Sequence, residues 1–163
     1  MISLRPVVDR LTPKPTAFNG LWFKAVGGAA EYAQVMAEKL PLPRAWIVRY
    51  HEKAVPAGVG MADDQVFYDV VFGIDNIRNL SDFENDEKLL AYRRAVNGLL
   101  LGWQMPGALN PTKFWGGGVI DYSAGVVFWF DRYSADAQLM NFPADPDPMI
   151  DDLTLDRTGD YPA

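Results

Sequence analysis

Apolar residues recur at three- and four-residue steps in three stretches of the chain, which is the spacing of a helix with one buried face. These stretches cover residues 2–11, 29–40 and 81–101. The longest begins with Ser81 and Glu84 at the spacing of a capping box, and Gly102 follows as the expected stop. Its predicted buried face consists of Leu89, Tyr92, Val96, Leu99 and Trp103.

Other stretches have the pattern of strands, with side chains pointing alternately to opposite faces. Residues 21–26 predict a short extended piece before the second helix. Residues 45–51 alternate over their whole length, so Tyr50 and His51 are expected on opposite faces.

The segment 65–75 is the strongest predicted strand. Apolar residues occupy most positions on both of its faces, so we expect it to be covered on both sides. Asp69 is the exception: it faces solvent, caps a neighbouring strand or pairs with an arginine such as Arg49. Residues 53–64, which contain one proline and two glycines, predict a loop before this strand.

The last predicted element is an aromatic hairpin. Its strands are residues 114–122 and 126–133, and Ser123-Ala124-Gly125 is the turn. The run Gly116-Gly117-Gly118 predicts a bulge or a close backbone approach in the first strand. The order of elements predicts an α+β fold with a single mixed, mostly antiparallel sheet of about four to five strands, packed with about two to three helices.

Charge divides the chain into two parts. The protein has 163 residues and a net charge of −6, and residues 143–163, with six Asp and one Arg, carry −5 of it. We therefore predict one domain over residues 1–142 and an acidic Pro/Asp-rich arm over residues 143–163, which adds little to the core. The nearly neutral domain has no basic patch, so recognition of nucleic acid by sequence is not expected.

Few side chains are suited to catalysis or to metal binding. The chain has no cysteine, and His51, the one histidine, has no evident partner for acid–base chemistry, so a structural role is expected. The glycine run at 116–118 lacks the Lys-Ser/Thr pair of a phosphate-binding loop, and Ser123 is better explained as a turn residue than as a nucleophile. The arm's aspartates are separated by prolines that exclude an EF-hand loop. We predict no catalytic, cofactor-binding or metal-binding residue and no enzymatic activity.

Two further features bear on function. The N-terminus has no apolar run long enough for a signal peptide or a membrane helix, so we expect a cytoplasmic protein with no membrane partner. Trp103, Trp115 and Trp129 are expected mainly in the core, with one of them left for a partner, because large aromatic residues are enriched at interfaces.

Three short pieces of the chain resemble the tail terminator (tail completion) proteins of tailed bacteriophages. They are Val26-Gly27-Gly28-Ala29-Ala30-Glu31, Leu100-Leu101-Gly102-Trp103-Gln104 with Pro106-Gly107-Ala108, and the aromatic hairpin after Phe114. The resemblance covers about residues 18–136 and rests on the order and spacing of the pieces. Relatives commonly have Gly-Trp-Gln-Pro-Pro, where this chain has Met105 at the first of those prolines, and the arm after Phe142 lies outside the resemblance.

The resemblance implies a structural protein of the virion tail, placed in the neck region after assembly in the host cytoplasm. It implies a hexameric ring on the head-proximal end of the tail tube. This ring stops tube polymerisation, lets DNA pass and offers a docking surface to the head–tail connector protein. The expected partners are further copies of the chain, the tail tube protein and the connector. Two alternatives are another head–tail joining or minor tail protein and, in a different class, a small-molecule-binding domain or hydrolase with a pocket under the aromatic hairpin.

A ring needs an interface that closes on itself, and the sheet edges and the 53–64 segment are the candidates. The predicted interface residues are Lys53, Val55, Val59, Met61, Asp63, Asp64, Met105 and Asp136.

Overall fold

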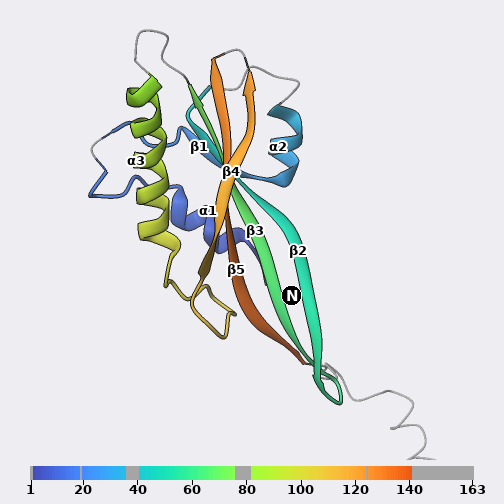
Figure 1. The fold of residues 1–163 in the computed structure, drawn as a ribbon. Helices are drawn as coiled ribbons and strands as arrows, with labels where there is room; N and C mark the ends of the chain where they lie inside the picture. The colour runs from blue at the N-terminus through green and yellow to red at the C-terminus, as the bar shows by residue number, and fades with distance from the viewer. Residues whose placement is uncertain (1, 19, 36–40, 76–81, 124, 141–163) are drawn as a thin grey trace, which may run out of the picture.

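The backbone builds one sheet of five strands in the order β1-β2-β3-β5-β4 (Figure 1). The strands are β1 (Ala25–Gly28), β2 (Arg44–Gly58), β3 (Met61–Asp75), β4 (Lys113–Ser123) and β5 (Val126–Met140). The computed structural model describes residues 2–18, 20–35, 41–75, 82–123 and 125–140. β1 is parallel to β2 and all other neighbouring pairs are antiparallel, so the predicted mixed, mostly antiparallel sheet is confirmed.

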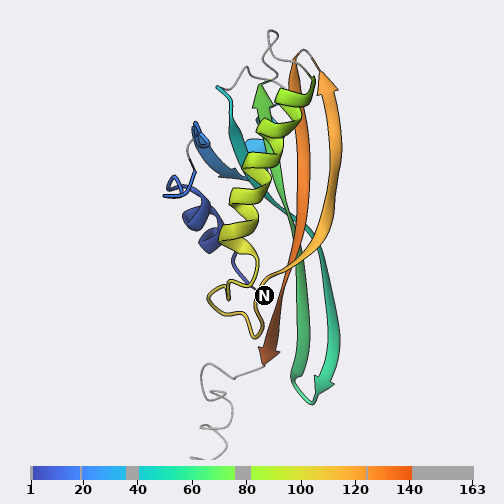
Figure 2. The same ribbon diagram turned by 60° about the vertical axis from the view of Figure 1, so that its left-hand side comes forward.

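Helices lie on both faces of this sheet (Figure 1, Figure 2). They are α1 (Arg5–Leu11), α2 (Ala29–Val35) and α3 (Asp82–Leu100). α1 and α3 share one face, and α2 lies on the other. Gly102, with a φ of 76°, follows α3 at the predicted stop. The predicted capping residue Ser81 and the end of the predicted helix at 36–40 lie outside the described residues.

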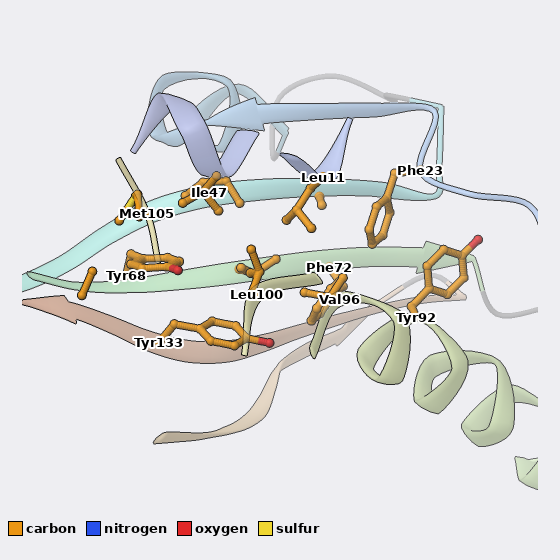
Figure 3. Packing of buried hydrophobic residues seen from close by; sticks show 14 of the residues in the cluster. Leu11, Phe23, Ile47, Tyr68, Phe72, Tyr92, Val96, Leu100, Met105 and Tyr133 are labelled. Carbon is orange, nitrogen blue, oxygen red and sulfur yellow. The ribbon is translucent and has the colours of Figure 1, made fainter. Parts of the chain in front are cut away.

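The main core lies between the sheet and the helices α1 and α3. Alternate residues of β3, from Val66 to Ile74, are buried in this core, and Figure 3 shows Tyr68 and Phe72 among its side chains. The helix contributes the predicted Leu89, Tyr92 and Val96 to this cluster, and Leu100 as well. Each fully buried side chain of this size contributes about 1.5–3 kcal/mol relative to an exposed one.

A smaller core lies on the opposite face, under α2. Trp46, Val71 and Phe128 are buried there, and Tyr32 of α2 packs against the Trp46 ring at a centroid distance of 5.6 Å. β3 is therefore covered on both sides in this half of the sheet, as its two apolar faces predicted.

In the other half of the sheet, the loop predicted at 53–64 is wrong. β2 continues to Gly58 and β3 begins at Met61, so these residues form a long hairpin with Val59-Gly60 as its turn. No described helix covers this half, and its residues therefore do not need an apolar face that would reveal a strand. A proline is tolerated here because β2 is an edge strand beyond Ile47.

The glycine run in β4 is a confirmed bulge and close approach. The register shifts between Phe114 and Gly116, whose φ is 125°. A Cβ on Gly117 would overlap the Asp131 carboxylate and the carbonyl oxygen of Phe130. The run therefore serves sheet packing, and it leads into no helix that could hold a phosphate.

Candidate functional site

Three strands extend beyond the helices to form a narrow ribbon (Figure 2). We call it the extension, and it consists of residues 52–58 of β2, the turn at 59–60, residues 61–66 of β3 and residues 135–140 of β5. β1 pairs with β2 only as far as Ile47, and β4 pairs with β5 only as far as Ser134. Within the described residues, the outer edges of β2 beyond Ile47 and of β5 over 137–140 are thus unpaired by strands. Such edges offer backbone donors and acceptors to another chain.

The tip of the extension is apolar and exposed. Val59 in the turn is fully exposed, and about half of the side chains of Val55 and Met140 is exposed. Met61 and Leu139 line a shallow hollow beside the turn. Exposed apolar residues that cluster on one small surface indicate a contact with a partner.

Asp136 joins the extension to the rest of the sheet. Its carboxylate accepts hydrogen bonds from Lys113 Nζ at 2.9 Å, Gln65 Nε2 at 3.0 Å and Asn110 Nδ2 at 3.2 Å. Partial burial alone would raise the pKa of Asp136, but these three bonds and the Lys113 charge outweigh it, so the pKa is lowered from the usual 3.8. The carboxylate therefore ties β3, β4 and the loop before β4 to β5.

A charged and aromatic strip lies on the open face of the sheet, beyond α2. Asp69 accepts two hydrogen bonds from Arg132, at 2.7 Å from Nε and 2.9 Å from Nη2. The Arg132 guanidinium lies 3.4 Å from the centroid of the Tyr50 ring and 5.3 Å from that of Phe130. This arrangement holds a cation and exposed aromatic surface in a fixed geometry.

Asp69 is thus paired with an arginine, as one of the three explanations proposed, but the suggested partner was wrong. Arg49 lies on the other side of β2, where it binds Glu52 and the carbonyl oxygen of Ile2. Arg132 sits directly opposite Asp69 in the β3–β5 register. The sequence could not reveal this pairing without the strand order.

The same strip continues through three further rings. His51 packs against Phe67 at 6.3 Å, and Phe67 packs against Trp115 at 5.5 Å between centroids. Trp115 is 58% exposed, and its Nε1 donates to Ser134 Oγ at 2.8 Å. Trp103 and Trp129 pack against the main core, so Trp115 is the tryptophan of the three that remains available to a partner.

The predicted alternation at Tyr50 and His51, which put the two side chains on opposite faces, is wrong. A register shift between Arg49 and His51 places both rings on the open face, where Tyr50 meets Arg132 and His51 meets Phe67. A bulge of this kind leaves no mark in a pattern of apolar and polar residues. His51 is exposed and makes ring contacts, in keeping with the structural role expected for it.

The structure brings together most, but not all, of the predicted interface residues. Lys53, Val55, Val59, Met61 and Asp63 lie in the extension with their side chains at least partly exposed. Asp136 lies in the extension but is engaged in the bonds described above. Asp64 and Met105 are only 3% and 1% exposed, and Met105 belongs to the main core. Tyr50, Phe67 and Arg132 were missed, because only the bulge and the strand order bring them to one surface with Trp115.

One further charged group, Asp131, is engaged in holding the fold. Asp131 is fully buried and binds Arg93 at 2.9 Å and the Nε1 of Trp129 at 2.9 Å. No three described His, Cys, Asp or Glu side chains are grouped so that they could hold a metal ion. None of the helices described is long and apolar enough to span a membrane.

An open groove lies elsewhere on the molecule. It has a volume of about 1000 Å³ and lies between residues 10–21 and α3. Residues 10–21 and α3 supply its lining, and no residue of the aromatic hairpin lines it. It therefore does not correspond to the pocket that the small-molecule alternative placed under the hairpin.

Comparison with protein families gives one match. A family model described as phage tail terminator protein matches residues 1–142. The match ends where the acidic arm begins. No curated protein is similar enough to the chain to give a match.

Proposed function

The chain belongs to the phage tail terminator family, a family of structural proteins of the phage tail, and from that premise we propose that it closes into a homo-hexameric ring on the head-proximal end of the tail tube. The ring stops the addition of further tube subunits and offers its other end to the head–tail connector. DNA passes through its centre. This places the protein in the neck region of the virion, with no catalytic step in its task.

The observation that carries the proposal is the pair of unpaired edges on the extension. Val55 of β2 lies opposite Asp63, which lies opposite Gln138 of β5, so the two edges lie at the same level. β2 and β5 are both antiparallel to β3 and therefore run in the same direction. The β2 edge of one copy can add to the β5 edge of the next as a parallel pair, a head-to-tail contact that repeats around a ring until it closes.

The apolar tip and the charged strip suit two different contacts of the proposed ring. The tip exposes Val59 and Met140 at one end of the ring, where an apolar contact suits a lasting joint with the tail tube protein. The strip around Arg132 and Trp115 lies next to the edges and suits the contact between copies, since Trp and Arg are the residues that most often dominate interfaces.

The direct test is polymerisation of the tail tube protein with and without this chain. We expect substoichiometric amounts to shorten the tubes seen by electron microscopy, with a ring on one end of each. Tubes that carry a ring but grow unchecked would indicate another joining protein of the tail. A chain that stays monomeric in the presence of tubes, and whose melting temperature rises with a small ligand, would contradict the structural role.

A further inference from the structure

The groove between residues 13–21 and α3 is a built feature with an uncovered apolar lining. Phe18 packs against the Tyr92 ring, and the Tyr92 hydroxyl donates to the carbonyl oxygen of Leu21, so the segment is fixed to the helix. Leu21 nevertheless exposes 81% of its surface beside this groove. Burial of such a side chain by an added segment would be favourable.

The rim of the groove is positively charged. Its cations are Arg10, Lys14, Lys88 and Arg94, and its described lining includes no Asp or Glu. Arg10 and Lys88 donate to the carbonyl oxygens of Leu99 and Asp75, which leaves their charges unneutralised by those bonds. Arg94 has one distant partner, Glu87 at 4.0 Å, and both side chains are largely exposed. This is a local excess of positive charge on a domain whose net charge is −1.

We propose that residues 149–156 of the acidic arm dock in this groove of their own protomer. The segment places four apolar residues among three aspartates: Met149, Ile150, Leu153 and Leu155 among Asp151, Asp152 and Asp156. This composition matches an apolar lining with a cationic rim, because the apolar side chains bury surface while the carboxylates meet the rim. The docking concerns a single chain and does not depend on ring formation.

The length of the arm is sufficient for this contact. The Tyr133 hydroxyl of β5 donates to Asn97 Oδ1 of α3 at 3.0 Å. The lower end of the groove therefore lies beside Tyr133 when positions are compared along the strand. Met140 lies seven residues further, or about 24 Å at the usual rise of a strand. Residue 149 follows Met140 by nine residues, which span about 30 Å when extended. An extended arm is therefore long enough to bring the segment from the end of β5 to α3 of the same chain.

Disulfide formation in the full-length protein tests the proposal, because the chain has no cysteine of its own. Leu153→Cys is combined with Ala91→Cys in the groove or with Ala54→Cys on β2. Ala54 is a matched control: it is also exposed, and it lies opposite Asp64, whose partner Ala137 is close to the start of the arm. An arm that moves freely would reach Ala54 at least as fast as Ala91.

We expect the intrachain disulfide to form roughly tenfold faster with Ala91→Cys than with Ala54→Cys, because docking raises the local concentration of the arm at the groove. The rate is measured on denaturing gels, where a crosslinked chain migrates faster. Equal rates, or a faster reaction at Ala54, would overturn the proposal. Disulfides that join two chains, at a rate that rises with protein concentration, would identify a second copy as the occupant and would also overturn it.

Charge reversal separates docking from chance proximity. Lys14→Glu with Arg94→Glu removes part of the positive rim. The rate of disulfide formation with Ala91→Cys is then expected to fall toward the rate with Ala54→Cys. Lys24→Glu, at an exposed residue that is not part of the groove's lining, is the control and leaves the rate of disulfide formation with Ala91→Cys unchanged. A rate that is the same in all three proteins would show that the arm does not recognise the rim.

Discussion

The two halves of the β2–β3 hairpin differ in what covers them. Where α2 and α3 lie over the sheet, Trp46 and Phe72 are fully buried on opposite faces. In the extension, residues 53–60 are all exposed and the strand edges are open. The covered half buries its large apolar side chains within the chain, so it holds most of the stability. In the extension, the open strand edges and the exposed side chains are left for a partner to cover, which is the property expected of an assembly surface.

The largest effect is expected from breaking the ion pair in the covered half. Asp131→Ala leaves Arg93 partly buried without its carboxylate, and we expect a loss of about 3 kcal/mol in the free energy of unfolding. Urea denaturation measures it. Asp131→Asn keeps an acceptor for Trp129 and is the matched control, with a smaller loss. A loss below about 1 kcal/mol for the Ala variant would mean that the covered half is not the stable part.

A smaller effect is expected on the open face. Asp69 and Arg132 are partly exposed, so Asp69→Ala should cost about 1–2 kcal/mol, less than the buried pair but more than a purely exposed residue. The same denaturation measurement applies, with the exposed Asp63→Ala on the same strand as control. A cost equal to that of Asp131→Ala would mean that the open face of the sheet holds its ion pair as firmly as the covered face does.

The Asp136 carboxylate should make the base of the extension sensitive to acid. Its pKa is lower in the folded chain than in the unfolded one, so its contribution to stability is present above the unfolded value and is lost as the pH falls through the folded value. The difference in stability between the parent and Asp136→Asn should therefore shrink as the pH falls through and below the usual pKa of 3.8. A difference that grows on acidification would contradict the lowered pKa.

The smallest change in stability, but a large change in function, is expected at the tip. Val59→Asp alters a fully exposed residue, so unfolding should change by less than about 0.5 kcal/mol while the shortening of tail tubes is lost. Phe83→Asp, at another exposed apolar residue on α3, is the control and should keep both properties. If both variants shorten tubes equally well, the tip does not contact the tube.

The covered half was predictable because burial imposes a pattern on the sequence. The alternation in 65–75 and the helical repeat in 81–101 each gave the right element and, for the most part, the right buried residues. The prediction failed where no described helix covers the strands, so that residues 53–64 had the composition of a loop and β5 continued seven residues beyond the expected Tyr133.

The candidate surface was predictable only in part, for the same reason. The extension residues were chosen from an exposed, partly apolar segment, and that choice needs no knowledge of strand order. The strip of Tyr50, Phe67, Trp115 and Arg132 comes from three different strand pairings and a bulge, none of which leaves a local signal. Met105 was predicted at the interface, but the fold buries it in the main core.

The most direct test of the ring uses cysteines at its two edges, Val55→Cys on β2 and Gln138→Cys on β5, in the presence of tail tube protein, with Lys53→Cys as a second register. Within one chain these positions are two strands apart, about 9.5 Å, which is too far for a disulfide. We predict that oxidation of the double variant gives a ladder of crosslinked chains that ends at six, and that each single variant gives no dimer. A ladder without an end, a product that stops at two, or dimers of the single variants would contradict head-to-tail closure of the ring.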